Sequence, residues 1–268
     1  MAVAGRGGRK VALVTGGGSG IGRGIALALG RRGVDVALAG RRLDLLEAVA
    51  AEVSSLGARA VPLQVDLADE AARGELVDRV LRELGRLDTL ANNAAVMARG
   101  ALLSRSAGEV RAAVATNLLA PIELTRHALP ELARRKGVVV LVASTVSQVP
   151  LPYASLYSAT KAGVWAFGEA LRFELQPLGV RLMLVYPPGT DTAMVRGLAD
   201  AAGVRGYPLA SAERVGERIV RSMARGREEV HMGVEDRLLM LIYRISPRLV
   251  RALYRSQRAR FERMMGGQ

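Results

Sequence analysis

Residues 10–22, KVALVTGGGSGIG, decide the fold of this chain of 268 residues. They begin with a short apolar run, residues 10–15, that has the character of a buried strand. Glycines follow at once, and residues 21–32 then place apolar side chains at helical spacing. Glycines at a strand-to-helix turn let backbone N–H groups approach a pyrophosphate at the positive end of the helix. We therefore predict a dinucleotide-binding turn, with cofactor contacts at Gly16, Ser19, Gly20, Ile21 and Gly22.

Strands and helices alternate along the rest of the chain. Apolar or β-branched runs predict strands at residues 10–15, 35–39, 59–65, 89–92, 138–143 and 180–186. Helical spacing predicts helices at residues 21–32, 43–56, 69–84, 106–133 and 155–176, the fourth of them disturbed by Pro121. Strict alternation is typical of a parallel sheet with right-handed crossovers. We predict one α/β domain, residues 1–235, built on a single doubly wound Rossmann-type parallel sheet with helices on both faces, followed by a C-terminal helical extension, residues 236–268.

The composition limits the classes of protein to which the chain can belong. Cysteine is absent, and the two histidines, His127 and His231, are far apart in sequence, so we expect no disulfide and no metal site. The first residues lack the apolar segment of a secretory signal, and no apolar run approaches the roughly 18–20 residues of a membrane span. We expect a cytoplasmic protein that is at most peripheral to the inner face of a membrane.

The formal net charge of +13 has two explanations. Arginines that coat a solvated surface account for it without any partner, and a basic surface also suits nucleic acid or an anionic membrane. The basic residues of the first 230 positions are scattered and have no aromatic residues interleaved with them. We therefore expect no nucleic-acid binding.

The end of the second predicted strand, Ala39-Gly40-Arg41-Arg42, bears on the choice of cofactor. An acidic residue here hydrogen-bonds the ribose 2′-hydroxyl of NAD, whereas arginine accommodates the 2′-phosphate of NADP. Gly40 stands where an acid would repel a phosphate, and the guanidinium groups that follow suit phosphate oxygens. The alternative is that Arg41 and Arg42 only solvate a loop. We predict that NADP(H) is favoured over NAD(H).

Tyr157 and Lys161 are four residues apart on the helix predicted over residues 155–176. Of the 38 Lys and Arg residues only three are lysine, so a lysine at this place indicates a need for a compact ammonium. Positions i and i+4 share one helix face, which makes the phenol and the ammonium neighbours. A cation beside a phenol lowers its pKa from about 10. We predict that Lys161 lowers the pKa of Tyr157 and makes it a proton donor usable near neutral pH.

In this order and spacing the motifs resemble those of the short-chain dehydrogenase/reductase family over about residues 10–230. The motifs are the glycine loop, Asp66, Asn92-Asn93-Ala94, Asn117, Ser144 and the Tyr157/Lys161 pair. Ser147 competes with Ser144 on spacing alone. Ser144 is preferred because it lies nearest the end of the strand over residues 138–143, where a doubly wound sheet places its ligands.

The resemblance implies a catalytic set of Asn117, Ser144, Tyr157 and Lys161. Tyr157 would pass its proton to the substrate oxygen while the cofactor delivers hydride, and Ser144 would hydrogen-bond the same oxygen. Lys161 would bind the nicotinamide ribose, and Asn117 would hold a water that links Lys161 to solvent. Besides Tyr157 and Lys161, the implied cofactor contacts are Arg41, Arg42, Asp66, Leu67, Asn92 through its backbone, Ala94, Pro187, Gly189, Thr190 and Thr192.

Two positions depart from the family pattern. Ala95 stands where the family has glycine after Asn-Asn-Ala, so we expect its methyl group to narrow the floor of the cleft. Pro188 fills another usual glycine position and stiffens the backbone beside the nicotinamide, while Thr192 stays in register to reach the carboxamide. This variant is similar to the 3-ketosphinganine reductase branch, whose substrates are long-chain lipid ketones.

The C-terminal extension combines an apolar run at residues 238–243, a proline and a stripe of arginines. Pro247 should break the helix, and beyond it Arg248, Arg251, Arg255 and Arg258 follow at helical spacing opposite Leu249, Val250, Leu253, Tyr254 and Phe261. Such a helix can lie in an anionic membrane interface. The alternative is that it packs on its own domain or on a second subunit. We expect the extension to bind a surface and to contribute no catalytic group.

These observations together predict an NADPH-dependent carbonyl reductase whose small-molecule carbonyl or alcohol substrate is hydrophobic or lipid-like. The alternatives are an NAD-dependent alcohol dehydrogenase and a non-catalytic dinucleotide-binding scaffold, and the intact set of Ser144, Tyr157 and Lys161 argues against the scaffold. As partners we expect further copies of the chain, in a homodimer or homotetramer, and an anionic membrane at the C-terminal extension. Residues 193–211 should cover the substrate pocket, but they show no pattern that identifies the substrate.

Overall fold

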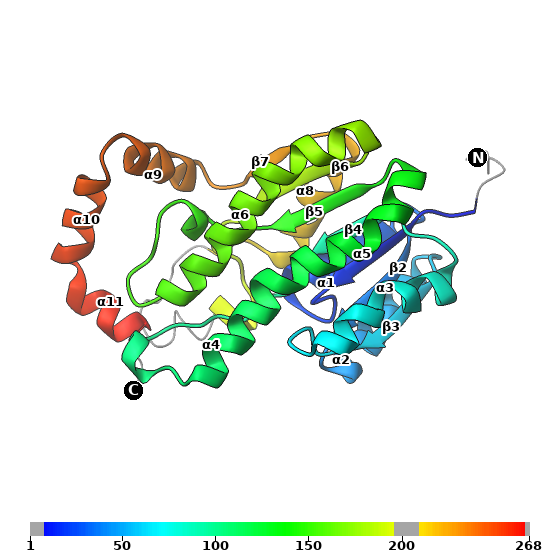
Figure 1. The fold of residues 1–268 in the computed structure, drawn as a ribbon, viewed down its shortest axis with the longest axis horizontal. Coiled ribbons are helices and arrows are strands. Elements are labelled where there is room, and N and C mark those ends of the chain that lie inside the picture. The colour runs from blue at the N-terminus through cyan, green and yellow to red at the C-terminus, as the bar shows by residue number, and fades with distance from the viewer. Residues whose placement is uncertain (1–7, 196–208, 266–268) are drawn as a thin grey trace.

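The structure, a computed structural model, describes residues 8–195 and 209–265. Its centre is a seven-stranded sheet in the order β3-β2-β1-β4-β5-β6-β7 (Figure 1). The strands are β1 Val11–Thr15, β2 Asp35–Gly40, β3 Ala60–Gln64, β4 Thr89–Asn92, β5 Val138–Val142, β6 Arg181–Tyr186 and β7 Glu229–His231. All neighbours pair in parallel. The strand order reverses between β1 and β4, which is where such sheets form a ligand crevice.

The six predicted strands are confirmed, each within one residue of its predicted ends. The prediction missed β7, which has a single buried residue, Val230. This strand forms by pairing with the edge of β6, where Val185 lies opposite Val230. Three residues held by one long-range pairing leave no periodic pattern in the sequence.

Helices cover both faces of the sheet, as predicted (Figure 1). One layer contains α1 Gly20–Gly30, α2 Leu43–Ser55 and α8 Ala212–Ala224, and the other contains α3 Glu70–Leu84, α5 Ala120–Arg135 and α6 Ser155–Leu175. Successive strand residues alternate between the two layers, so that Leu13 packs with the second layer and Val14 with the first. The doubly wound α/β fold is therefore confirmed.

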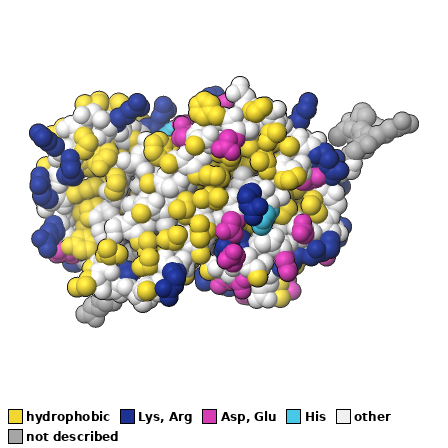
Figure 2. Space-filling view, in the orientation of Figure 1, with side chains coloured by type: hydrophobic (Ala, Val, Ile, Leu, Met, Phe, Trp, Pro, Cys, Tyr) yellow, Lys and Arg dark blue, Asp and Glu magenta, His cyan; other side chains and the backbone are white. Residues whose placement is uncertain are grey.

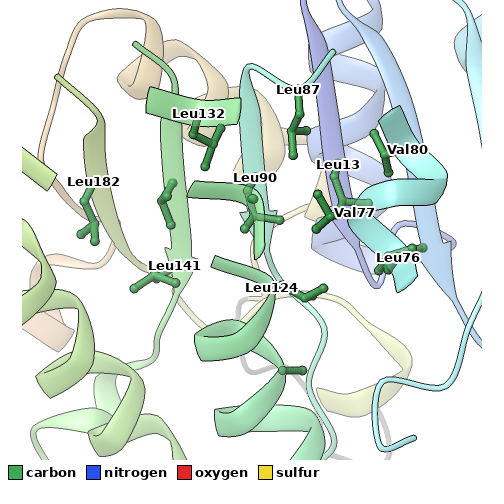
Figure 3. Packing of buried hydrophobic residues seen from close by; sticks show 14 of the residues in the cluster. Leu13, Leu76, Val77, Val80, Leu87, Leu90, Leu124, Leu132, Leu141 and Leu182 are labelled. Atoms are coloured by element: carbon green, nitrogen blue, oxygen red, sulfur yellow. The ribbon is translucent and has the colours of Figure 1, made fainter. Parts of the chain in front are cut away.

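The larger hydrophobic core joins α3 and α5 to the middle of the sheet. Figure 3 shows Leu13 and Leu90 from the strands close to Val80 of α3 and to Leu124 and Leu132 of α5. All five are fully buried. Each leucine removed from water contributes roughly 1.5–3 kcal/mol. This core fixes the strands whose carboxyl ends form the site described below.

The helix predicted over residues 106–133 is interrupted. α4, Ala107–Val114, passes into a π-helical turn, Ala115–Leu119, before α5 begins. Pro121 has no N–H group, and in a regular helix its ring would crowd the carbonyl of Asn117 four residues earlier. The wider turn relieves this conflict and contains Asn117. The predicted disturbance at Pro121 is confirmed.

The C-terminal extension folds as three helices, α9 Val234–Ile245, α10 Pro247–Ser256 and α11 Arg258–Met265. Pro247 is the first residue of α10, where its missing N–H group has no intrahelical partner to lose, so the predicted break is confirmed. The three helices form a curved band along one end of the molecule (Figure 1). Among the described residues, no helix combines the length and the apolar character that crossing a bilayer requires.

One side of this band packs on the chain's own domain. Val149 forms a small buried cluster with Met240 of α9 and Val250 of α10. At the far end, Tyr153 Oη donates a hydrogen bond to Glu262 Oε1 of α11 at 2.6 Å. The division of the chain at residue 235 stays a prediction, since the two parts share this cluster.

The predicted apolar face of the extension is corrected by this packing. Val250, Tyr254 and Phe261 face inward, whereas Leu249 and Leu253 remain exposed. The sequence pattern placed Leu249, Val250, Leu253, Tyr254 and Phe261 on one apolar side of the extension. Helical spacing alone does not show which part of a broad apolar face packs on the domain.

Candidate active site

A cleft of about 920 Å³ opens where the strands of the sheet end. The predicted residues that line it are Gly16, Ser19, Gly20, Ile21, Arg41, Arg42, Asp66, Leu67, Ala94, Ser144, Tyr157, Lys161, Pro187, Gly189, Thr190 and Thr192. Three predicted residues, Gly22, Asn92 and Asn117, lie outside its wall. The carboxyl edge of a doubly wound sheet is the usual place for a ligand.

The glycine loop leaves the N-terminus of α1 open toward the cleft. Ser19 is the N-cap residue, its side chain makes no capping hydrogen bond, and the first turn has no acidic residue. Backbone N–H groups at such a helix end attract an anion. A methyl group on Gly22 would lie 2.1 Å from the carbonyl oxygen of Gly16, so the tight turn requires glycine there. This uncapped helix end fits the pyrophosphate of a dinucleotide.

Thr15 and Asn93 join the segment after β4 to the glycine loop. Thr15 Oγ1 accepts hydrogen bonds from the backbone N–H groups of Asn93 and Ala94, both at 3.0 Å. Asn93 Nδ2 donates to the Thr15 carbonyl oxygen at 2.9 Å. The buried Asn92 side chain instead donates to Thr125 Oγ1 of α5 at 3.2 Å. The Asn92 side chain therefore points away from the cleft, whereas Asn93 and Ala94 line it, and the cofactor contact through the Asn92 backbone stays a prediction.

Two guanidinium groups lie at the end of the cleft where β2 ends. Arg41 and Arg42 both line it, and Arg42 Nη2 donates to Ser19 Oγ at 3.2 Å. This hydrogen bond brings Arg42 back to the glycine loop, a contact that the sequence did not indicate. Gly40 contributes no carboxylate to this strand end. The arrangement suits an anionic group in addition to a pyrophosphate.

α6 presents Tyr157 and Lys161 to the floor of the cleft from one helix face. Both side chains are buried and both line the cleft. Lys161 Nζ lies 5.9 Å from the centre of the Tyr157 ring. It donates a hydrogen bond to the Val142 carbonyl oxygen, at the end of β5, at 2.7 Å. Tyr157 and Lys161 therefore place a phenolic proton and an ammonium group beside the same part of the cleft.

Ser144 lies close to Tyr157 on the cleft floor, where its side chain lowers the pKa of the phenol, and its Oγ accepts a hydrogen bond from the Val146 backbone N–H group at 3.4 Å. It precedes a short 3-10 turn, Thr145–Ser147. Ser147 is buried, and its Oγ accepts a hydrogen bond from the Ser144 backbone N–H group at 3.2 Å. Of the two serines that sequence spacing left open, Ser144 alone lines the cleft. The Ser144 and Tyr157 side chains thus lie in the wall of the same cleft.

The glycine loop and this set of side chains occur together in a known family. A family model described as short chain dehydrogenase matches residues 10–203 of the chain. The chain belongs to the short-chain dehydrogenase/reductase family. The predicted family resemblance is thereby confirmed.

Several family members are similar to this chain over most of its length. A short chain dehydrogenase of Pseudocercospora fijiensis is 35% identical over 194 residues, which cover 69% of this chain and 61% of that protein. The 11-beta-hydroxysteroid dehydrogenase-like 3 protein of Arabidopsis thaliana is 34% identical over 190 residues, covering 69% of this chain and 60% of that protein. The chain thus spans about three fifths of the length of these relatives. The finer resemblance to 3-ketosphinganine reductases stays a prediction.

A solved structure of the family has the same fold. The alcohol dehydrogenase of the archaeon Thermococcus sibiricus, complexed with 5-hydroxy-NADP, is 27% identical with a TM-score of 0.74. The superposition covers 84% of this chain and 96% of that protein. Members of the short-chain dehydrogenase/reductase family are oxidoreductases that use a nicotinamide dinucleotide.

The structure corrects one electrostatic expectation for this family member. Burial raises the pKa of the Tyr157 phenol to about 12, and the nearby Ser144 side chain opposes this rise only in part. Burial also lowers the pKa of the Lys161 ammonium to about 8. Desolvation disfavours both charged forms, and the hydrogen bond of Lys161 goes to a carbonyl oxygen and not to the phenol. The predicted lowering of the Tyr157 pKa is therefore wrong for the chain alone.

Asn117 is fully buried in the π-helical turn. Its Oδ1 accepts from the Val96 backbone N–H group at 2.8 Å, and its Nδ2 donates to the Val96 carbonyl oxygen at 2.9 Å. The same Nδ2 donates to Thr160 Oγ1 at 3.2 Å. Asn117 thus ties the segment after β4 to α6 beside Lys161. The water that it would hold stays a prediction.

The two departures from the family pattern lie in the cleft wall. Ala95 packs together with Met97 and Val146 against the Tyr157 cluster, so its methyl group adds to the apolar surface that desolvates the phenol. Thr190 Oγ1 donates to the Pro188 carbonyl oxygen at 2.7 Å and braces this segment.

The end of the cleft next to the C-terminal helices is mostly apolar. Val149, Leu239 of α9 and Tyr254 of α10 line it. Asp236 also lines it, hydrogen-bonded to Thr145, and burial raises the pKa of its carboxyl group. No pattern in the sequence indicates that the extension contributes to this wall, because the contacts join segments far apart along the chain.

The segment predicted to cover the substrate pocket, residues 193–211, lies mostly outside the described residues. Its described beginning, Ala193 to Val195, lines the cleft.

Proposed function

We propose that the chain is an NADPH-dependent carbonyl reductase. It would transfer a hydride to the carbonyl carbon of a ketone and a proton to the carbonyl oxygen, giving an alcohol. The meeting of Ser144, Tyr157 and Lys161 on the cleft floor supports this proposal most directly. A scaffold that only bound a dinucleotide would have no use for a phenol and an ammonium buried beside a serine in the cleft wall.

A bound reduced nicotinamide supplies the hydride, and the side chains of the protein orient and protonate the ketone. The hydroxyl groups of Ser144 and Tyr157 donate hydrogen bonds to the carbonyl oxygen and hold it in place. As negative charge develops there, the phenolic proton of Tyr157 moves to it. The ammonium of Lys161 then stabilises the phenolate until a proton from solvent restores the phenol.

Tyr157 is in the protonated form from which reduction of a ketone would start. With its pKa raised to about 12 by burial, the phenol holds its proton at neutral pH, as a general acid must.

NADPH is the proposed cofactor in preference to NADH. Arg41 and Arg42 offer two guanidinium groups at the end of β2, and Gly40 contributes no carboxylate to repel a phosphate. The similar archaeal alcohol dehydrogenase is complexed with 5-hydroxy-NADP. Its ligand supports the choice by analogy.

The proposed substrate is a hydrophobic, lipid-like ketone. The wall formed by Val149, Leu239 and Tyr254 supports this, since an apolar pocket binds apolar chains. We also propose a homodimer or homotetramer at the inner face of a membrane. Phe173 of α6 is 79% exposed, and a second subunit would cover such a side chain.

Cofactor titrations and a ketone series test this proposal. Protein fluorescence should report tighter binding of NADPH than of NADH, and kcat/KM should rise with the chain length of the ketone. If NADPH binds and no ketone of any length is reduced, the reductase proposal is wrong. Equal affinity for both cofactors would contradict the proposed preference for NADPH, but it would not contradict the proposed reduction of a ketone.

A further inference from the structure

The outer side of the C-terminal helices exposes an apolar stripe. Val234, Leu238, Leu241 and Ile245 recur along one side of α9, and Leu249 and Leu253 continue on α10. We call these six residues the tail stripe. Their relative exposures lie between 48% and 85%. Isolated exposed leucines are common, but six large apolar side chains on adjoining helices indicate a binding surface.

Unpaired arginines accompany the tail stripe. α9 and α10 contain Arg237, Arg244, Arg248, Arg251 and Arg255, all of them exposed. In the described part of the chain, none of these five has a carboxylate within ion-pair distance. Arginines of the catalytic domain such as Arg32 and Arg73 do have one. Figure 2 shows Lys and Arg side chains gathered along the edge of the molecule formed by these helices.

The charge of this surface favours an anionic occupant over a second copy. Residues 236–268 contain eight arginines and two acidic residues, and therefore a formal net charge of +6. A two-fold contact would place the same patch on itself and bring arginines against arginines. Glu235 is the one exposed acid among the described residues of α9 and α10, too few to compensate. A bilayer with anionic lipids offers both the apolar layer and the opposite charge.

The inner side of the same helices faces the cleft. Leu239 follows Leu238 of the tail stripe directly, yet it lines the cleft together with Tyr254. The membrane-facing surface and the substrate pocket are therefore separated by the thickness of one helix layer.

We propose that the tail stripe inserts into the interface of an anionic membrane, and that the ketone passes from the bilayer into the cleft beside Leu239 and Tyr254. The second half of this inference rests on the proposed reductase function. Binding to the membrane does not depend on it.

Vesicle co-sedimentation of the full chain tests the membrane half. The protein should sediment with phosphatidylcholine vesicles that contain phosphatidylglycerol at low salt, and much less with pure phosphatidylcholine or at high salt. Leu238→Gln with Leu241→Gln should weaken binding at least tenfold. Arg244→Gln with Arg248→Gln should weaken it by about five- to thirtyfold, at roughly fivefold for each arginine. The matched control is Leu102→Gln with Leu103→Gln, which removes two exposed leucines elsewhere and should bind like the wild type.

Kinetics with two ketones separate the halves. A short, water-soluble ketone should be reduced equally well by the wild type and all variants, whereas turnover of a vesicle-held long-chain ketone should fall in parallel with vesicle binding. No binding to anionic vesicles, or an equal loss in the control pair, would overturn the inference. If the wild type does not bind vesicles, and the variant with Leu238→Gln and Leu241→Gln has a lower mass than the wild type by light scattering, the tail stripe contacts a second copy of the chain instead. If the wild type reduces neither ketone, the proposed reductase function is wrong. The proposal that the tail stripe binds a membrane is still tested by vesicle binding alone.

Discussion

Lys161 Nζ lies 5.9 Å from the centre of the Tyr157 ring, yet its hydrogen bond goes to the Val142 carbonyl oxygen at 2.7 Å. The end of β5 thus anchors the ammonium beside the phenol without a direct contact to its hydroxyl group. The cation is near enough to stabilise a phenolate after the proton has left. It does not ionise the phenol beforehand, because burial disfavours both charged forms.

Tyr157→Phe should fold, still bind NADPH and lose at least about a thousandfold in turnover, because general acid catalysis supplies roughly 10²–10⁴ in rate. The phenylalanine ring keeps the packing against Ala154. Steady-state kinetics with any accepted ketone and a cofactor titration check this. Tyr186→Phe, which removes another buried phenol outside the cleft, is the control and should keep its turnover. More than a tenth of wild-type turnover in Tyr157→Phe would rule out the assignment.

Lys161→Met should be inactive and yet at least as stable as the wild type near neutral pH. The folded chain holds the pKa of Lys161 at about 8, below the ordinary value of 10.5, so the unfolded chain binds this proton more readily. The stability of the wild type should therefore rise with pH between about 8 and 10.5, by on the order of 3 kcal/mol. Below pH 8 the full penalty of the buried charge is present.

Urea unfolding of both proteins at several pH values measures this difference. The methionine variant keeps every other titrating group, so subtracting its curve isolates Lys161. If the difference between the two proteins does not change from pH 7.5 to 9.5, the buried ammonium has no depressed pKa.

Arg41→Ala should weaken NADPH binding by roughly 1.5–3 kcal/mol and leave NADH almost unchanged, since only NADPH has the 2′-phosphate. Arg42→Ala should act in the same direction, because Arg42 reaches the glycine loop through Ser19. Paired calorimetric titrations measure both cofactors, with Arg59→Ala outside the cleft as the control. Equal losses for NADPH and NADH would mean that these arginines support the loop and do not bind the phosphate.

The sequence predicted what local patterns determine. Buried runs such as Val138–Val142 end at polar residues, so both the strand and the place of Ser144 follow from the pattern alone. The pattern does not show which of the adjacent Asn92 and Asn93 side chains faces the cleft, because only the pleat of the folded strand decides this. The apolar end of the cleft next to the C-terminal helices depends on the packing of Val149 against Met240. This contact joins segments far apart along the chain, and no periodicity in the sequence reveals it. The pKa of Tyr157 could not be predicted either, because the burial that raises it also comes from contacts between distant segments.

Glu262→Ala should loosen the contact between α11 and the segment before α6. Glu262 Oε1 accepts hydrogen bonds from Tyr153 Oη at 2.6 Å and from Arg258 Nε at 2.7 Å. Tyr153 has a φ of 58°, in a region that side chains rarely adopt, so it depends on such contacts. We expect KM for long ketones to rise by about two- to fivefold, with kcat and NADPH affinity unchanged, as suits an exposed ion pair. Glu235→Ala on α9 is the control, and the same rise in KM there would show a general effect of charge.

Two glycine-to-alanine changes should have opposite signs. Gly74 lies inside α3, and a methyl group there would meet only His127 Cε1, at 3.9 Å. Gly74→Ala should stabilise the protein by about 0.5–1 kcal/mol, because alanine loses less backbone entropy on folding. A methyl group on Gly216 of α8 would instead lie 2.1 Å from the carbonyl carbon of Gly24 in α1.

Gly216→Ala should therefore push α8 away from α1 and destabilise the protein by about 1–3 kcal/mol or more, since neither backbone can yield without moving its helix. α1 begins in the glycine loop, so the variant should also bind NADPH more weakly, while Gly74→Ala should bind it normally. Urea unfolding and a fluorescence titration measure the two effects on the same samples. If Gly216→Ala has the stability of the wild type, the backbones of α1 and α8 are not in direct contact at Gly24 and Gly216.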